Sequence, residues 1–499
     1  MGLRSVRHRR RFIIVIVLFI ILGLVSPALA HQPVERKPDV WPADGRLFIL
    51  DGDGSAVDVI DFPDGRRVAR LPVPPHPLSM GLSPDRKLLF VFRGRSTEED
   101  WVTVIRTGFD AEAKAARRPV VLASFQGEAP GGVEAGDLAQ AFGRPAIVME
   151  KTGVLTVYDG DWGRPGGVRV RTIRLAAPDH IHFVETDDAL YVGFLRQGFV
   201  QAIDKATGAE FARLSGCPAL HGVAYDPDTG RTFWGCKNDV MVVGTRGPEK
   251  GKRVGRIPLP DGAPVRVAAF AAGADRVLWG YTEGPLPVVY RLDLRTDAYR
   301  LEPVDAYGAI RVAATKGGSS KLLLLAEDGV LWVLDGRSGR PLRSVKIASA
   351  FPEDLDEDAG RAAMPDIQPW DGTAAWVSLP HEGRVVLVDL ERGALLRTVV
   401  TGGAPTRLAF LPAAGSRPET FRREAAPYSR SAFAAALLRL VKPDWTPPSG
   451  KSGTGPMADV PADHPAAPVV EAVLARGWMR GDGRGFAPDR PVTRQEAAV

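Results

Sequence analysis

The chain has 499 residues, of which 25% are charged and 45% hydrophobic, and its formal net charge is +5. Its two cysteines exclude a fold that depends on a disulfide framework, and 54 glycines and 42 prolines predict many turns. A chain of this length exceeds one ordinary domain unless the domain is built from repeats or forms a barrel. The sequence has no basic stripe with interleaved aromatic residues, so we expect no nucleic-acid partner.

The first thirty residues have the three parts of a secretory signal peptide. Five arginines precede an apolar run of about 14 residues, Phe12 to Val25, and Ala28-Leu29-Ala30 supplies a small-residue cleavage site. Such a run is short for a permanent membrane helix, which needs roughly 20 residues, although an uncleaved anchor is the alternative. We expect residues 1–30 to be removed, which takes the formal net charge to zero and leaves an exported protein that is not integral to the membrane.

A short pattern recurs along most of the mature chain. Each copy alternates apolar and polar residues, usually ends in Asp and is followed by a turn with Gly, as in Val200 to Asp204 before Thr207-Gly208. The alternation predicts a β-strand with one buried face. Eight copies are spaced 40 to 54 residues apart, the size of one four-stranded propeller blade. They end at residues 61, 106, 159, 204, 244, 293, 335 and 389.

A second pattern lies upstream of most copies and predicts the innermost strand of each blade. Its members are the segments at 80–85, 223–228, 265–270, 310–313 and 406–411. The strands after Arg46 lack such a partner, whereas Gly402 to Leu411 supplies one with nothing after it, so we expect the two ends to share one composite blade. The fold class is therefore all-β, an eight-bladed propeller over residues 44–412. Seven blades are the alternative, because Thr107 to Asp137 is poorly patterned.

Together the two patterns, P-x-x-x-A-x-S-P-D followed by V-x-V-I-D-x-x-T-G, resemble the YVTN-type β-propeller repeat family. The resemblance covers roughly residues 44 to 412 and implies the fold. Propellers host many unrelated functions, so the resemblance implies no activity by itself.

Four histidines lie at or near the start of expected inner strands, and they are the candidate metal ligands. They are His76, His180, His182 and His221. His180 and His182 are two residues apart and would point the same way on a strand. Because inner strands converge at the centre of a propeller, these imidazoles could meet there and hold Zn²⁺ or a similar ion. The alternative is a set of scattered polar residues that bind water.

The two cysteines, Cys217 and Cys236, lie symmetrically about the turn Asp226-Pro227-Asp228, so they would face each other on one hairpin. In an oxidising compartment we expect a disulfide, with a thiolate metal ligand as the alternative.

The segment Cys217 to Gly222, with Cys236 after the next strand, resembles the propeller-type extracytoplasmic zinc metallochaperones. The two other histidine-bearing segments and Gly402-Gly403-Ala404-Pro405 contribute to the resemblance. It implies zinc as the bound metal and a metal-transport binding protein as a partner, whereas the residues alone leave the cofactor unknown. The chain departs from that family in lacking a tail rich in His and Asp, of which only His31 is present.

The composition changes after residue 412. Residues 413–456 predict a helix at Ser429 to Val441 and then a linker rich in Pro, Gly and Ser. Residues 457–499 resemble an S-layer homology repeat, with an Asp-Val start, a helix, a Gly-rich turn, a Phe-x-Pro and a Thr-Arg helix start in order. These elements are Asp459-Val460, Pro465 to Gly477, Gly481 to Gly485, Phe486-Ala487-Pro488 and Thr493-Arg494-Gln495-Glu496.

The S-layer homology resemblance implies that Thr493, Arg494 and Glu496 bind a cell-wall polysaccharide. An arginine in the first turn of a helix places a guanidinium beside free backbone N–H donors, which suits an anionic sugar. Thr493 and Glu496 also fit a capping box, and the two roles are compatible. The match stops at Val499 inside the motif, so we expect a truncated repeat.

No Gly-x-Ser-x-Gly, His-Glu-x-x-His or Walker sequence is present. We therefore expect a non-enzymatic binding protein at the cell surface or cell wall, with zinc or another transition metal as the candidate ligand. One alternative is an enzyme with its site at the propeller centre, such as a metal- or quinone-dependent oxidoreductase or a lyase. A purely structural envelope protein is the other.

Overall fold

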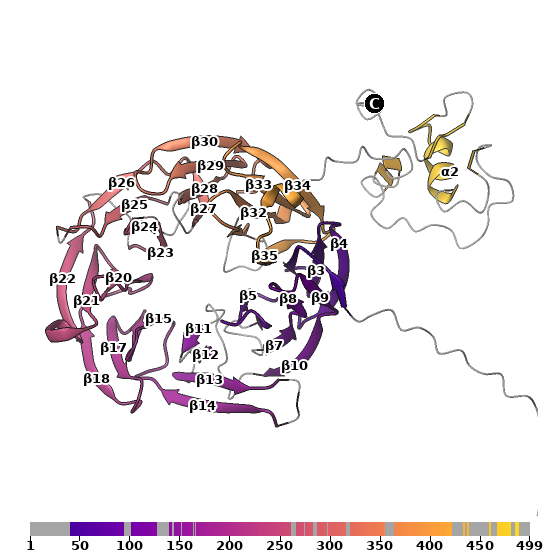
Figure 1. The fold of residues 1–499 in the computed structure, drawn as a ribbon. Coiled ribbons are helices and arrows are strands. Elements are labelled where there is room, and N and C mark those ends of the chain that lie inside the picture. The colour runs from indigo at the N-terminus through magenta and orange to yellow at the C-terminus, as the bar shows by residue number, and fades with distance from the viewer. Residues whose placement is uncertain are drawn as a thin grey trace, which may run out of the picture. The chain divides into compact units, whose positions relative to one another are not determined.

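The computed structural model describes residues 40–421 with internal gaps, the largest at 94–100, 127–138 and 356–363, and parts of 433–488. These residues form eight antiparallel sheets of four strands, which are arranged as the blades of a ring (Figure 1). The eight-bladed, all-β propeller is thereby confirmed. No helix in the described part of the chain is long and apolar enough to cross a membrane.

Each of the first four blades is given from its inner to its outer strand. They are β35 (Pro405–Pro412), β2 (Gly45–Asp51), β3 (Ala56–Phe62) and β4 (Arg66–Pro72); β5 (Ser79–Leu82), β6 (Leu88–Arg93), β7 (Trp101–Arg106) and β10 (Val120–Gln126); β11 (Ala139–Ala141), β12 (Arg144–Met149), β13 (Val154–Gly160) and β14 (Val168–Arg174); and β15 (Ile181–Glu185), β16 (Ala189–Phe194), β17 (Phe199–Asp204) and β18 (Glu210–Ser215).

The other four blades follow in chain order. They are β19 (Val223–Asp226), β20 (Arg231–Cys236), β21 (Asp239–Gly244) and β22 (Lys252–Pro258); β23 (Ala269–Ala272), β24 (Val277–Tyr281), β25 (Val289–Asp293) and β26 (Leu301–Val304); β27 (Ala309–Ala314), β28 (Lys321–Ala326), β29 (Val330–Asp335) and β30 (Pro341–Lys346); and β31 (Ile367–Pro369), β32 (Ala374–Leu379), β33 (Arg384–Asp389) and β34 (Ala394–Val400). Short 3₁₀ turns are η1 (Gly247–Glu249), η2 (Pro380–Glu382) and η3 (Pro418–Phe421).

The eight repeated sequence copies are the third strands of the eight blades, as their spacing predicts. The expectation that only one face of each copy is buried is wrong. Strand β3 is buried along its whole length, and β21 is buried at every position but the first. Each blade stands between two neighbours, so both faces of its middle strands are covered, and buried polar residues such as Asp58 are accommodated by ion pairs with Arg67 and Arg70.

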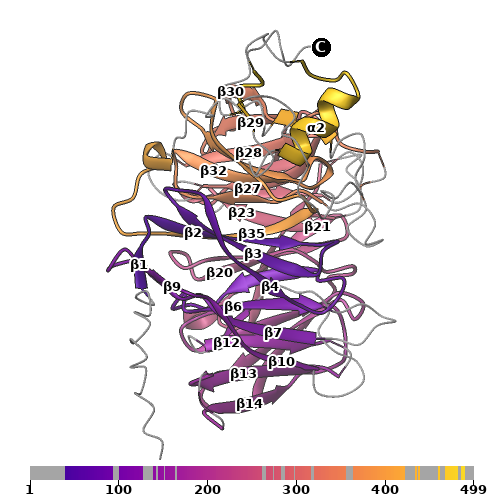
Figure 2. The ribbon, with the colours of Figure 1, turned by 90° about the vertical axis from the view of Figure 1, so that its right-hand side faces the viewer.

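The ring closes through the composite blade that the sequence predicts. Strand β2 pairs with β35 from Gly45↔Pro412 to Leu50↔Arg407, and Figure 2 shows these strands beside β3 and β4. Arg46 on β2 is fully buried, and its guanidinium makes two bonds of 2.6 and 2.8 Å to the carboxylate of Asp61. It also donates to the carbonyl oxygen of Thr107 in the next blade at 2.5 Å. The bond to Thr107 therefore ties the closing blade to its neighbour, and Asp61 balances the charge of the buried guanidinium.

The poorly patterned stretch after Thr107 contains an insertion rather than a missing blade. Strands β8 (Phe109–Asp110) and β9 (Ala115–Arg117) join β1 (Val40–Pro42) in a separate three-stranded sheet. The chain then returns as β10, which pairs with β7 and completes the second blade. Strands β7 and β10, which flank the insertion, belong to the same blade. The insertion therefore lengthens a connection within that blade and does not take the place of a blade, so the count is eight and not seven.

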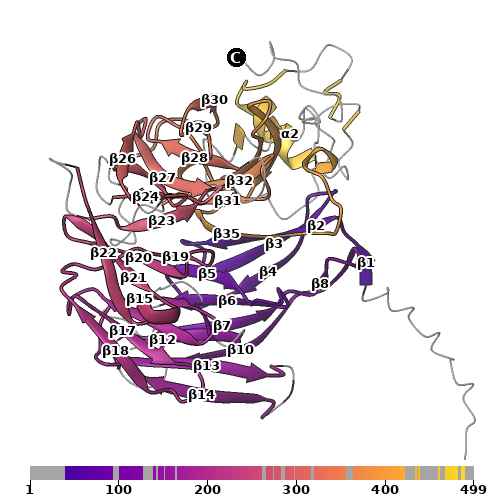
Figure 3. The ribbon, with the colours of Figure 1, turned by 60° about the vertical axis from the view of Figure 1, so that its left-hand side comes forward.

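The inner strands lie nearest the centre of the ring, where consecutive blades bring their first strands side by side (Figures 1 and 3). One of them begins later than its sequence predicts. Strand β23 starts at Ala269, whereas the pattern places it at 265–270. Arg266 instead forms a bridge to Lys237 in the preceding blade, and the chain first bonds to its own sheet at Ala268, whose N–H donates to Tyr281 O of β24 at 2.8 Å.

The described C-terminal residues form a small hydrophobic core around helix α2 (Ala467–Ala475), where the sequence predicts a helix. The helix ends in a Schellman motif: Trp478 N–H donates to Val473 O, and Gly477, with φ of +67°, donates to Leu474 O. The same core includes Ala434 and Leu438, which are helical as expected for residues 429–441.

Asp459 holds the Phe-x-Pro segment by accepting backbone bonds from Phe486 and Ala487. Several expectations lie outside the described residues. These are the signal peptide at 1–30, the linker at 442–456 and the residues Thr493, Arg494 and Glu496.

Candidate metal centre

Three of the four predicted histidine ligands come together at the start of two adjacent inner strands. His180 and His182 lie immediately before and within β15, and His221 lies two residues before β19. Because β15 and β19 are neighbours at the centre of the ring, residues 41 positions apart in sequence meet in space. The ring centroids are 5.0 Å apart for His180 and His182 and 4.3 Å apart for His182 and His221.

The three imidazoles can offer nitrogen atoms to one ion. One ring nitrogen of each lies within 4.8 Å of those of the others, and Nε2 of His180 is 3.3 Å from Nε2 of His221. All three side chains are partly buried, so a ligand would be held away from bulk water while the site keeps an opening. No other such group of His, Cys, Asp and Glu is found in the described part of the chain.

Two hydrogen-bond acceptors, each bonded at Nδ1, orient the imidazole rings of His180 and His221. Nδ1 of His180 lies 3.2 Å from the carboxylate of Glu150, which follows β12 and is 4% exposed. Nδ1 of His221 lies 2.7 Å from the carbonyl oxygen of Ala268, just before β23. A carbonyl oxygen can only accept, and an ionised carboxylate likewise, so both Nδ1 atoms carry the proton and both Nε2 atoms present lone pairs.

Sequence reasoning missed Glu150. It ends the apolar run Ile147-Val148-Met149, and a carboxylate directly after a buried strand is the signal that could have found it. The carboxylate also accepts the backbone N–H of Ile181 at 3.1 Å, so it holds both the ring of His180 and the backbone that follows it.

Nε2 of His182 is buried and has no hydrogen-bond partner. Burial, then repulsion from His221, His180 and Arg266, lowers the pKa of His182 well below its usual value. At neutral pH this imidazole is therefore uncharged, which is the form that binds a metal.

The residues fit a divalent transition metal. The lone pairs of His180 and His221 face each other at 3.3 Å, an arrangement that is unfavourable unless a proton or a cation lies between them. Two nitrogen ligands of a tetrahedral Zn²⁺ ion, each 2.0–2.1 Å from it, stand about 3.3–3.4 Å apart. The orphaned nitrogen of His182 would supply the third ligand.

His76 does not join this group. It lies in the turn between β4 and β5, is exposed, and adopts a left-handed backbone with φ of 56°. That turn leads into the second blade, whereas the other three histidines belong to the fourth and fifth blades. The start of an inner strand is therefore not sufficient to bring a side chain to the centre.

A disulfide between Cys217 and Cys236 fastens the segment that carries His221. Both cysteines are fully buried, with their Cα atoms 4.9 Å apart. The segment turns at Ala219, which has φ of 52°, and His221 N–H then donates to Gly235 O at 2.9 Å. The cysteines do not face each other as partners on one regular hairpin, because this turn intervenes before β19 begins.

The family comparison concerns the C-terminal part of the chain. Residues 456–498 match the S-layer homology domain. The chain carries an S-layer homology domain. Within the S-layer homology domain, the match includes Asp459, helix α2 and the Thr-Arg motif that sequence reasoning singles out.

The propeller resembles solved structures of low sequence identity. AztD from Citrobacter koseri superposes with a TM-score of 0.60 at 19% identity, covering 75% of this chain and 100% of that one. Apo AztD from the same organism gives 0.59 at 19% identity, covering 76% and 100%. The dihydro-heme d1 dehydrogenase NirN, in complex with DHE, gives 0.51 at 15% identity, covering 80% of each chain. No curated protein matches by sequence. These similarities show the fold, which supports different functions.

Proposed function

We propose that this protein is an extracytoplasmic binding protein that holds Zn²⁺, or a closely related divalent ion, between His180, His182 and His221. One observation carries the proposal: three imidazole nitrogens converge, two of them oriented by hydrogen bonds at Nδ1 and the third buried without a partner. The likeness of the Cys217 to Gly222 segment to propeller zinc metallochaperones supports zinc as the ion.

Binding is favoured over catalysis by the contacts of the Glu150 carboxylate. Three histidines leave one coordination position open, which is also the pattern of catalytic zinc sites. Catalysis at such a site usually needs a general base beside the open position. Glu150 is instead occupied with His180 and the Ile181 N–H. An open position suits an ion that is passed to another protein, and a metal-transport binding protein is the proposed recipient.

We also propose that the protein is attached to the cell wall. The support is the S-layer homology domain, in which Thr493, Arg494 and Glu496 would bind an anionic wall polysaccharide. The signal peptide at residues 1–30 would deliver the chain across the membrane, and a disulfide at Cys217 and Cys236 agrees with an oxidising compartment.

Metal analysis of the mature chain tests the first proposal. After exposure to Zn²⁺ and removal of excess metal, we expect about one ion per chain. The double variant His180→Ala with His221→Ala should lose it, and the matched control His76→Ala should retain it. A substoichiometric content that the double variant leaves unchanged contradicts the metal site and favours a structural role.

Sedimentation with purified cell walls tests the second proposal. The unmodified mature chain should pellet with the walls, and deletion of residues 413–499 should leave it in the supernatant. If the deletion pellets equally well, attachment does not depend on the S-layer homology domain. The single variant Arg494→Ala tests the residue that the family resemblance assigns to the polymer.

A further inference from the structure

The outer strands of the blades carry charge of one sign. Counted over the described outer strands, twelve exposed residues are basic and two are acidic. The basic residues are Arg66, Arg67, Arg70, Arg169, Arg171, Arg174, Arg213, Lys252, Arg253, Arg256, Arg343 and Lys346, and the acidic ones are Glu210 and Glu302. The mature chain as a whole is nearly neutral, so positive charge is concentrated on this rim.

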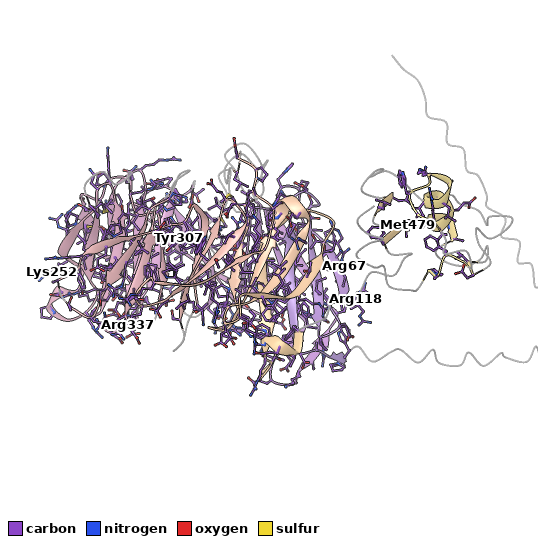
Figure 4. All side chains as sticks on the ribbon, turned by 90° about the horizontal axis from the view of Figure 1, so that it is seen from above. Arg67, Arg118, Lys252, Tyr307, Arg337 and Met479 are labelled. Atoms are coloured by element: carbon purple, nitrogen blue, oxygen red, sulfur yellow. A yellow bond between two sulfur atoms is a disulfide. The ribbon has the colours of Figure 1, made fainter. Side chains whose placement is uncertain are left out.

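Seven of the twelve basic residues lie on three consecutive outer strands, β14, β18 and β22, which we call the basic arc. Strands β18 and β22 are in contact, and the three strands follow one another along the margin of the ring (Figure 1). Figure 4 shows Lys252 at that margin. The one acidic residue of the arc, Glu210, is bonded to Arg213 at 2.7 and 2.8 Å.

Most of the arc's charge is not neutralised from within. Among the described residues, no carboxylate forms an ion pair with Arg169, Arg174, Lys252 or Arg253. Of the other arc residues, Arg213 pairs with Glu210 and Arg256 pairs with Asp239 on β21. A row of guanidinium groups without partner carboxylates favours an anionic ligand, because the planar fork binds carboxylate or phosphate through two parallel hydrogen bonds.

A recess adjoins the arc beside β22. Its volume is about 460 Å³, and Arg231, Arg256, Tyr299, Val254 and Ile257 contribute to its walls. Nη1 of Arg231 donates to the Tyr299 hydroxyl at 2.9 Å, and the guanidinium lies 5.7 Å from the centre of the tyrosine ring. Both arginines also pair with carboxylates, Arg231 with Glu249 at 3.5 Å and Arg256 with Asp239. The tyrosine hydroxyl and the aliphatic walls suit a sugar ring, and Lys252 and Arg253 on the same strand β22 supply positive charge for an acidic group.

We propose that the basic arc binds an acidic polysaccharide of the cell wall, as a second contact besides the S-layer homology domain. Charged residues, lysine above all, also protect exposed strand edges from pairing with other chains. Six of the seven basic residues of the arc are arginine, which edge protection does not require but which suits bidentate binding of carboxylate or phosphate. One sign over three blades, with a recess alongside, favours an anionic polymer. The choice of a wall polymer rests on the proposed attachment to the wall, because two linked contacts with one polymer mesh strengthen each other.

The test measures binding of the mature chain to polygalacturonate, with neutral dextran as the uncharged probe. Every protein carries Arg494→Ala, so that the proposed S-layer homology contact does not contribute. The arc variant combines Arg169→Glu, Arg174→Glu and Arg253→Glu. The control combines Lys87→Glu, Lys114→Glu and Arg337→Glu, which are exposed basic residues in turns outside the outer strands and give the same change in net charge.

The arc variant should bind polygalacturonate about tenfold more weakly or worse than its parent, and the control should stay close to the parent. Dextran should not bind. Equal binding by the arc and control variants overturns the proposal, as does tighter binding of the parent to phosphatidylglycerol vesicles than to the glycan. If the arc variant does not fold, the test uses the parent protein alone. Its affinity for polygalacturonate should fall steeply as salt is added, and an affinity that does not change with salt contradicts the proposal. We expect the arc alone to bind too weakly to pellet the chain, so loss of wall sedimentation after deletion of 413–499 is compatible with both proposals. If the deletion variant pellets as well as the intact chain, attachment through the S-layer homology domain is refuted, while the glycan-binding result for the arc stands.

Discussion

The most informative perturbation of the candidate metal centre is Glu150→Gln. The carboxylate is 4% exposed, lies 3.2 Å from Nδ1 of His180 and accepts the Ile181 N–H at 3.1 Å. The amide keeps one acceptor oxygen and nearly the same volume, so the fold should survive. The substitution removes the negative charge of Glu150. That charge holds the proton on Nδ1 of His180 and makes Nε2 of the same ring more basic. Partners of this kind typically contribute 10- to 100-fold in metal affinity, or about 1.4–2.7 kcal/mol.

The size of the effect separates a supporting residue from a ligand. Zinc sites with four ligands are worth about 10–16 kcal/mol, so one ligand accounts for roughly 3 kcal/mol, which is more than 100-fold in affinity. We therefore expect Glu150→Gln to weaken Zn²⁺ binding less than His182→Ala does. Glu185→Gln, at the other end of strand β15, is the matched control and should not change the affinity.

Competition titration against a chromogenic chelator at neutral pH measures these affinities. The reasoning fails in two ways that the titration can distinguish. If Glu150→Gln binds within about threefold of the unmodified protein, the hydrogen bond to His180 does not support the site. If it loses as much affinity as His182→Ala, Glu150 is itself a ligand, and the role derived from its contacts is wrong.

Three further predictions follow from groups that are buried around the ring. Replacing Cys217 and Cys236 with alanine should lower the free energy of unfolding by roughly 3 kcal/mol, and an unchanged denaturation midpoint would contradict this. Arg46→Leu should lower the free energy of unfolding by about 3–5 kcal/mol in the same assay, because it leaves Asp61 charged and buried. A smaller decrease than that caused by an exposed Arg→Leu change would show that Arg46 does not stabilise the closing blade. The lowered pKa of His182 means that the unfolded metal-free chain binds more protons, so stability should fall as pH drops below the unfolded value near 6.5. His182→Gln should lose less in melting temperature between neutral and acidic pH, and an equal loss would show that another group is responsible.

The sequence predicts the fold well because the repeat marks one defined strand in every blade. Each copy, such as Val200 to Asp204, is the third strand, and the spacing between copies therefore counts the blades. The composite blade is predictable for a related reason, since Gly402 to Leu411 and the strands after Arg46 are incomplete on their own. The two-sided burial of these strands is not predictable from alternation, because it depends on neighbouring blades that a local pattern does not describe.

The candidate site is only partly predictable, because whether the histidine side chains meet depends on how close to the centre of the ring each segment lies. His180, His182 and His221 share a position at the start of an inner strand, and so does His76, yet His76 is exposed in a left-handed turn. Glu150 belongs to the preceding blade and has no metal-binding sequence signature. A carbonyl oxygen such as that of Ala268 has no sequence signal at all, since every residue carries one.

The pairing of β2 with β35 sets an order of events for a chain that emerges with its N-terminus first. The two partners are separated by almost the whole propeller, so β2 presents an unpaired edge until residue 412 has appeared. Contacts this distant in sequence form slowly, and an exposed edge invites pairing with other chains meanwhile. The histidine cluster needs only residues between Glu150 and Ala268. Its parts can therefore assemble before the circle is complete.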